Sequence, residues 1–554
     1  MSSRSLAAMA VVSLLAGVAC GATGSNRQPQ AVIQASPAAP LHSPAPTLSG
    51  AIRQAAHLGP AGADTEVNLS LGLSTRNPDR LAGLLATGQT VSPAEYASEF
   101  GPDAALAQGA VALLTARGFR ASWHPGSGLI SADGPAPAAA SLLNVAIGNY
   151  RLPNGITFYA SLDQPRIPTQ LAAIVTSVTG LDNYTKAFSH AVRPGGLTPT
   201  DTLAFYNLKA LRDQGLDGTG QTVVLPEIDN VILSDLDKFA AKFNLPPFGP
   251  LLTIKHDPNW GTPEAPAGET VLDLEIIHEV APNAKLVIYL AGPQIALADR
   301  AFDQMVTDHL GSIISDSIGQ CEAGVGSGHR NLVASIEDRA VALGMSHFVA
   351  SGDLGAYGCG DGSTLSVDFP SALPNITSVG GTTAFQSVNG TYFKEMAWSG
   401  PIEGAGTGGG ASLYYARPSY QDSVAQAAGH GMRQVPDVAS NGDPASGFSF
   451  IFKGRAGQAG GTSAAAPLWS GTLALINQDL KKKGLREAGF ANPALYWMGQ
   501  NSSKLPAPPF HDVTSGNNLA SNAGPGWDFA TGLGSMDAAA LDQAWILYIK
   551  GGGA

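Results

Sequence analysis

The chain has 554 residues, and only 13% of them carry a formal charge, whereas about a quarter is usual for a soluble domain. The net charge of −12 and the lack of a basic stripe exclude a nucleic-acid binder, and 44% hydrophobic residues exclude a disordered chain. This length predicts two or more folding units.

The first 22 residues have the pattern of an export signal. Arg4 supplies a positive charge, residues 6–19 are almost entirely apolar, and small residues follow. The apolar run is shorter than the roughly 20 residues that span a membrane, and no second run of that length follows. We therefore expect a secreted protein without a transmembrane span. Lipid anchoring through Cys20 in a bacterial envelope is the alternative to plain cleavage of the signal.

A linker is predicted over residues 23–64, because its first part is rich in Pro, Ala, Ser and Gln without apolar periodicity. A small α+β domain is predicted over residues 65–190. Its expected strands are 67–73 and 128–132, and its expected helices are 78–85 and 104–117.

A Gly- and Pro-rich stretch over 190–200 precedes a second domain, predicted over 191–548. In this domain buried strands alternate with helices, which predicts an α/β fold with a mostly parallel sheet flanked by helices. The expected strands are 221–225, 285–290, 313–315 and 347–350, and the expected helices are 271–280 and 332–343.

Besides Cys20, the chain contains Cys321 and Cys359. A single pair in an exported protein predicts a disulfide. Two unpaired buried thiols are the alternative.

The strongest local motif is Gly461-Thr462-Ser463, followed by small residues and an apolar helix. A serine among small residues at a helix start leaves room for a substrate carbonyl, and the helix N-terminus favours developing negative charge. An N-cap is an equally good interpretation. A seryl nucleophile also needs a base, and none of the 11 histidines lies in a His-Gly-Thr context.

The best carboxylate pair is Glu269 and Asp273, which share one helical face at a spacing of four residues. Two adjacent carboxyls in an apolar helix are costly unless they share a proton, and sharing raises one pKa. This suits a general base that works in acid. The alternative is a solvated acidic face that continues through Glu275 and Glu279.

Two further motifs carry acidic side chains. Asp353 ends a buried strand at Ser351-Gly352-Asp353, either as a turn residue or as a protonated donor to an oxyanion. Asp512 and Asp528 lie in Gly-rich turns, where carboxylates and carbonyls can bind calcium. The spacing does not fit an EF-hand loop, and a turn without metal is the alternative.

Taken in chain order, these motifs resemble those of the sedolisin (serine-carboxyl) peptidases of the kumamolisin-like type, over about residues 65–545. The resemblance implies a subtilisin-like fold preceded by a pro-kumamolisin-type activation domain. It implies that Ser463 is the nucleophile, Glu269 the base, Asp273 its partner and Asp353 the oxyanion donor. It also implies one Ca²⁺ ion held by the carboxylates of Asp512 and Asp528 and the carbonyls of Val513, Gly524 and Gly526.

The chain departs from the family pattern at several places. Ser317-Ile318-Gly319 stands where an aromatic residue usually lies between Ser and Gly, which leaves the subsite preference open. Gly460 replaces a frequent serine, and residues 86–93 of the propeptide look trimmed.

These features predict a secreted, acid-active serine endopeptidase made as a self-activating zymogen. Its partners would be polypeptide substrates and its own propeptide, an intramolecular inhibitor removed by cleavage near 185–200, and the protein would be a monomer. A catalytically silent binding protein and a subtilisin-type enzyme with a histidine base are the alternatives. The sparse charge is interpreted as an adaptation to low pH, because acid unfolds proteins largely by protonating ionised carboxylates.

Overall fold

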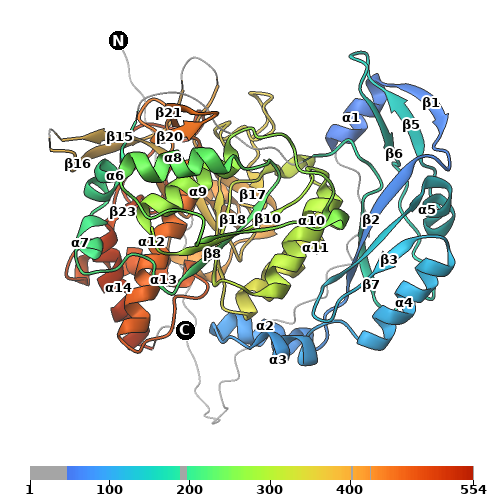
Figure 1. The fold of residues 1–554 in the computed structure, drawn as a ribbon, viewed down its shortest axis with the longest axis horizontal. Helices are drawn as coiled ribbons and strands as arrows, with labels where there is room; N and C mark the ends of the chain where they lie inside the picture. Colours follow the sequence, from blue (N-terminus) through green and yellow to red (C-terminus); the bar gives the residue numbers. More distant parts are fainter. Residues whose placement is uncertain (1–45, 187–195, 388, 401–403, 425, 553–554) are drawn as a thin grey trace, which may run out of the picture. The chain divides into compact units, whose positions relative to one another are not determined.

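The computed structural model describes residues 46–186, 196–387, 389–400, 404–424 and 426–552 (Figure 1). The predicted export signal, including Cys20, lies outside the described residues. None of the helices in the described part of the chain is both long and apolar enough to cross a membrane.

The N-terminal domain is built on an antiparallel sheet. Its strands in spatial order are β3 (Arg120–Ser122), β4 (Leu129–Pro135), β2 (Glu66–Leu73) and β7 (Val175–Thr179). Its helices are α2 (Pro78–Thr87), α3 (Pro93–Glu99), α4 (Ala104–Ala116) and α5 (Ala136–Leu143). Along β2, Val67 and Leu69 point into the core of this domain, whereas the Ser70 hydroxyl donates to the carbonyl of Ala296 in the second domain (2.9 Å). The two-residue period of the strand therefore provides one face for the core and one for the second domain.

The predicted linker over 23–64 is wrong for the part that the structure describes. This part contains α1 (Pro46–Gln54) and β1 (Ala56–Pro60), and β1 pairs with β5 (Gly148–Arg151), which pairs with β6 (Thr157–Ala160). Leu48 and Ala51 of α1 are buried with Phe158 of β6. These apolar contacts order a segment whose composition predicted no structure.

The second domain is built on a mostly parallel sheet, which confirms the predicted α/β fold. Its strands in spatial order are β16 (Tyr392–Ala397), β15 (Thr377–Gln386), β13 (Ser346–Ala350), β11 (Ile313–Asp316), β8 (Thr222–Glu227), β10 (Lys285–Leu290) and β9 (Leu252–Lys255), with β19 (Val438–Asn441) beside β15. The edge strand β16 runs antiparallel to β15. Short antiparallel pairs accompany this sheet: β12 (Gln320–Cys321) with β14 (Asp368–Phe369), β17 (Gly410–Ala416) with β18 (Met432–Val435), β20 (Phe448–Phe452) with β21 (Arg455–Ala459), and β22 (Phe510–His511) with β23 (Ser535–Met536).

Helices cover both faces of this sheet. They are α6 (Pro199–Phe205), α7 (Lys209–Arg212), α8 (Leu233–Phe243), α9 (Glu269–Val280), α10 (Ile295–Asp308), α11 (Ser327–Ala342), α12 (Thr462–Lys482), α13 (Asn492–Asn501) and α14 (Ala538–Lys550). Val223 and Ile313 lie in the core that contains α9 and α12, whereas Val224 and Ile314 lie in the core that contains α10 and α11. Consecutive residues of one strand thus serve two cores, as expected for a sheet buried on both sides.

A disulfide joins Cys321 and Cys359, whose Cα atoms are 4.8 Å apart. Cys321 ends β12, directly after the Ser317-Ile318-Gly319 segment, and Cys359 lies in the loop that follows Asp353. The disulfide therefore connects the two segments that follow β11 and β13.

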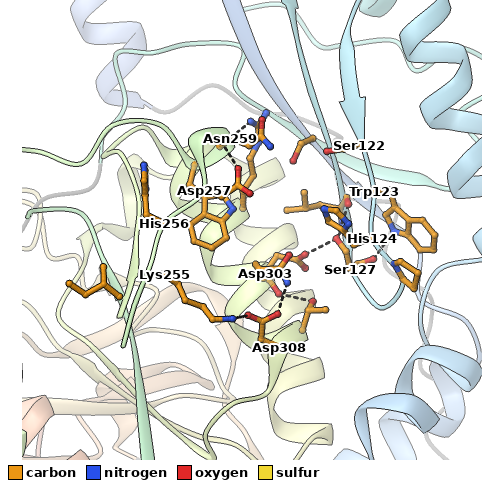
Figure 2. A pocket seen from close by; sticks show the side chains of 18 residues that line it. Ser122, Trp123, His124, Ser127, Lys255, His256, Asp257, Asn259, Asp303 and Asp308 are labelled. Atoms are coloured by element: carbon orange, nitrogen blue, oxygen red, sulfur yellow. Dashed lines mark hydrogen bonds and ion pairs between the residues drawn. The ribbon is translucent and has the colours of Figure 1, made fainter. Parts of the chain in front are cut away.

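The two domains meet across buried polar contacts within one compact unit of the chain. Arg300 of α10 pairs with Asp133 of β4 (2.6 Å). Asp303 of α10 accepts a hydrogen bond from Ser127 of the N-terminal domain (2.6 Å) and pairs with Arg339 of α11 (2.7 Å). Figure 2 shows Asp303 and Ser127 on the wall of an open cavity of about 670 Å³ between the domains. Since losing one partner of a buried ion pair is strongly destabilising, these contacts hold the N-terminal domain against α10 and α11.

Several buried carboxyls outside these ion pairs have raised pKa values, which predicts a fold that is more stable in acid. Burial raises the pKa of Glu279 to about 8 and that of Glu395 to about 7. Such a group stabilises the fold fully below its unfolded pKa, near 4.5 for Glu279, and loses this contribution as the pH rises through the folded value. His278 opposes this effect, because burial lowers its pKa to about 4.

We expect the melting temperature to fall as the pH rises from 5 to 9, because the buried carboxyls outnumber the buried neutral histidines. Circular dichroism of the Ser463→Ala variant measures this without self-cleavage. The Glu279→Gln variant is the control, since a neutral amide should flatten the decline. A melting temperature that instead falls steeply between pH 6 and pH 4 would contradict the expectation.

Candidate active site

Ser463 is the second residue of α12 and is completely buried. The helix follows Gly461, whose φ of 99° suits glycine because it has no Cβ. Gly471, two turns further along α12, lies close to Val280 of α9: a Cβ at position 471 would lie 3.0 Å from the Val280 Cβ. The two helices can therefore approach closely, which brings the start of α9 beside the start of α12.

Glu269 and Asp273 lie on the first turn and a half of α9, all of whose residues are buried. A buried cap that the sequence did not predict holds the helix start. The Asp229 carboxylate accepts hydrogen bonds from the backbone of Gly268 (2.9 Å) and from both the backbone and the hydroxyl of Thr270 (3.1 and 2.7 Å). Because Asp229 follows a strand about 40 residues earlier, no local signal marked it as a cap.

The carboxyl pair is buried and strongly perturbed. Burial raises the pKa of Glu269 well above its ordinary value, the Asp273 charge raises it further, and the nearby Ser463 hydroxyl acts in the opposite direction. Burial likewise raises the pKa of Asp273, and the Ser317 hydroxyl opposes this. The Ser463 hydroxyl lies close enough to Glu269 to act on its pKa but outside hydrogen-bond geometry, a distance that catalytic groups often close only when substrate binds.

The solvated acidic face considered for α9 is wrong, because Glu275 and Glu279 are buried as well. Glu275 accepts a hydrogen bond from the backbone of Ile451 (3.0 Å). The Thr202 hydroxyl acts on the Glu279 carboxyl. Of the acidic residues on α9, Glu269 is the one on which the Ser463 hydroxyl acts, and Asp273 lies one helical turn after it.

Asp353 is locked to the start of α12. Its Oδ1 accepts hydrogen bonds from the Thr462 backbone N–H (2.7 Å) and hydroxyl (2.7 Å), and the Gly352 N–H donates to that hydroxyl (3.0 Å). A turn residue bonded to its own backbone, the other interpretation of the sequence, is therefore wrong. Because Oδ1 accepts these bonds, a proton on this carboxyl would sit on Oδ2 and could be donated.

The segment after β11 completes the site. The Ser317 hydroxyl donates to the Ser463 carbonyl (3.2 Å). Asp368, which the sequence did not single out for chemistry, has a buried carboxyl beside Gly319 and Gly352, and burial raises its pKa to about 8. Its position follows from the pairing of β12 with β14, a contact between residues about 50 positions apart.

The structure gathers the predicted calcium ligands in one loop region. The Asp512 carboxylate accepts the Gly526 N–H (2.9 Å), and the Asp528 carboxylate accepts the Gly524 N–H (2.8 Å). Within the described residues, no group of three or more His, Cys, Asp or Glu side chains could hold a metal. A cation here would therefore depend on backbone carbonyls in addition to two carboxylates, a donor set that fits a hard ion such as calcium.

Comparisons with known proteins agree with this geometry. Residues 53–184 match the pro-kumamolisin activation domain, and residues 261–497 match the subtilase family. Kumamolisin from Bacillus sp. (strain MN-32) is 32% identical over 464 residues, which cover 76% of this chain and 80% of the relative. Sedolisin from Pseudomonas sp. (strain 101) is 31% identical over 577 residues, which cover 94% of this chain and 95% of the relative. The solved structure of Pseudomonas sedolisin, complexed with two molecules of pseudo-iodotyrostatin, aligns with a TM-score of 0.57 and 30% identity over 65% of this chain and all of that chain.

We expect Gly352→Ala to destabilise the protein by roughly 2–5 kcal/mol, as the sum of left-handed backbone strain and overpacking. Gly352 has a φ of 104°, and a Cβ there would clash with the Asp368 carboxyl. The matched control is Gly362→Ala, which has a φ of 63° but nothing within 4 Å of a Cβ, so only the backbone strain should remain. Urea unfolding measures the free energy of unfolding of both variants. If both lose the same amount of stability, a clash between the new Cβ and the Asp368 carboxyl is contradicted.

Proposed function

Because the chain belongs to the sedolisin family of serine-carboxyl peptidases, we propose that it is a secreted, acid-active endopeptidase made as a zymogen. The observation that carries the proposal is the buried Glu269–Asp273 pair beside Ser463. The groups that act on the Glu269 carboxyl are Asp273, Ser463, Asp229 and Asp353, and none of them is a histidine.

In the proposed mechanism Glu269 is the general base. Its carboxylate accepts the proton of the Ser463 hydroxyl while Oγ attacks the carbonyl carbon of the substrate peptide. Asp273 shares a buried proton with Glu269 and orients it. The proton then passes from Glu269 to the leaving amine, and an acyl-enzyme remains on Ser463. Glu269 next takes a proton from the water that attacks the acyl carbon, and this proton returns to the Ser463 oxygen as the acid product leaves.

Asp353 is proposed as the donor to the oxyanion that develops during attack. It can donate only when it is protonated. Donation from Oδ2 is compatible with the bonds that Oδ1 accepts from Thr462. This requirement supports an acidic working range.

The N-terminal domain is proposed to act as an intramolecular inhibitor that is removed on maturation. Its buried ion pair between Asp133 and Arg300 supports tight docking. Leu197 is bonded on both sides to the second domain, through Gly447 (2.6 Å) and Ser449 (2.7 Å). We therefore expect the mature chain to start before Gly196, within the range of 185–200 that the sequence predicts.

The family's calcium ion is proposed to bind through the carboxylates of Asp512 and Asp528 and the carbonyls of Val513, Gly524 and Gly526. When bound, the ion would supply structural cross-linking of two loops rather than chemistry at Ser463. The burial of Val513 and Asp528 supports this role, because the loops already pack against the core.

Replacing the nucleophile or the base should remove acid proteolysis. We expect Ser463→Ala to lower kcat by at least about 10⁴-fold and Glu269→Gln by about 10²–10⁴-fold. Casein digestion at pH 3–5, together with N-terminal sequencing of acid-incubated protein, measures both activity and maturation.

The matched control for these variants is Glu279→Gln, a buried glutamate on the same helix that is neutral at this pH and should leave activity unchanged. If Ser463→Ala still matures and digests casein, the assignment of the nucleophile is wrong. If the wild-type protein is silent at pH 3–5, the binding-protein alternative holds. Activity that peaks near pH 8 would favour a histidine base.

Chelation should destabilise the mature enzyme if calcium binds at the proposed loops. We expect EDTA to lower the melting temperature by several degrees and added Ca²⁺ to restore it, because a ligand that binds only the folded state stabilises it. Asp512→Asn should weaken this response. An unchanged melting temperature with and without EDTA would contradict the calcium site.

A further inference from the structure

A buried histidine lies behind the segment that carries Ser317. His347 is on the central strand β13 and is 2% exposed. Its Nδ1 is 2.8 Å from a carboxylate oxygen of Glu337 on α11, and its Nε2 is 3.5 Å from one of Asp316 at the end of β11. Burying three ionisable side chains inside a parallel sheet is costly unless they pair with one another. An apolar residue would be the usual choice at this strand position.

The surroundings of His347 favour its charged form. Burial by itself lowers the pKa of His347, but the two carboxylates outweigh burial and raise the pKa to about 9. On its α10 side the imidazole meets the apolar ring of Phe302, with ring centres 5.7 Å apart.

Other ionisable groups face the two carboxylates and not the imidazole. Asp338 lies beside Glu337, and the Asp316 charge acts on Asp273 of α9. Asp299 and His329, which pair with each other (3.1 Å), line a small cavity together with Asp316. His347 is thus the cation that directly balances Asp316 and Glu337.

Asp316 connects this triad to the catalytic site. Its Oδ1 accepts a hydrogen bond from the backbone N–H of Ile318 (2.8 Å). The residue between them, Ser317, donates to the Ser463 carbonyl and acts on the Asp273 carboxyl. Hydrogen bonds to an ionised carboxylate are about twice as strong as those to a neutral one. A negative charge on Asp316 would therefore strengthen the hydrogen bond that holds residues 317–318.

We propose that His347 is a positioning residue for the reaction: its imidazole, held by Glu337, pairs with Asp316 and orients it, and Asp316 holds Ser317 and Ile318 against the nucleophile helix. Without His347, Asp316 and Glu337 would be two buried carboxyls with no histidine between them. The inference rests on the proposed peptidase function, because the segment it acts on lies beside Ser463 and Asp273.

The test compares Asp316→Ala, Asp316→Asn and His347→Gln in enzyme that has matured from the full-length chain. Asp338→Asn is the matched control, since Asp338 neighbours Glu337 on α11 but is bonded to Asn375 (2.6 Å) and does not face the histidine. The measurements are kcat and KM for a peptide substrate between pH 3 and pH 7, with folded enzyme quantified by circular dichroism.

We expect Asp316→Ala to lower kcat/KM by roughly 10- to 100-fold, as for a lost hydrogen bond to a charged group. Asp316→Asn should recover most of this loss, because its amide oxygen still accepts from Ile318. Asp316→Asn should also move the acidic limb of the pH profile to lower pH, since the Asp316 charge raises the pKa of Asp273. His347→Gln should lower kcat/KM as Asp316→Ala does, and Asp316→Ala should cost little more in that background.

A purely structural role for the triad would reduce the amount of folded enzyme without moving the pH limb. If Asp316→Ala, Asp316→Asn and His347→Gln all give the pH profile and KM of Asp338→Asn, the inference is wrong. If His347→Gln does not mature, the difference in kcat/KM and pH profile between Asp316→Ala and Asp316→Asn tests the inference. A wild-type enzyme that cleaves nothing would overturn the proposed function instead, which separates the two failures.

Discussion

The burial of Glu269 and Asp273 is the constraint on which the rest of the site depends. Two carboxyls can lie side by side without solvent only if they share a proton, and sharing raises the pKa of the pair. The structure imposes this requirement by burying α9 entirely, with the start of the helix capped by Asp229. The positive end of the α9 dipole also favours a negative charge on Glu269.

The same physics extends beyond the site to the whole fold. The low proportion of charged residues suggested that few ionised carboxylates are available for acid to protonate. The structure sharpens this interpretation, because buried carboxyls such as Glu279 and Glu395 have raised pKa values and are neutral in acid. The stability that these carboxyls contribute is therefore not lost when the pH falls. The cost arises at higher pH, where the unfolded chain ionises first.

The topology explains why these groups meet. Asp316 ends β11, and Asp353 follows β13, its parallel neighbour. In open parallel sheets functional groups gather beyond the carboxyl ends of the strands, and here they meet the starts of α9 and α12. The N-terminal domain instead contacts α10 through Arg300 and Asp303, and α11 through Arg339. The proposed catalytic helices and the proposed inhibitor thus occupy different faces of one sheet.

The sequence by itself determined the family, the α/β class and the residues of the site that lie in local motifs. Glu269 and Asp273 could be paired because helical periodicity is a local property, and Ser463 stood out through its small neighbours. Only the tertiary structure decided that the carboxyls are buried, that Asp353 bonds Thr462, and that Asp229, Asp368 and His347 belong near the site. It also replaced part of a predicted linker with α1 and β1. Periodicity and composition report on neighbours within a few residues, whereas burial and pairing arise between segments tens to hundreds of residues apart.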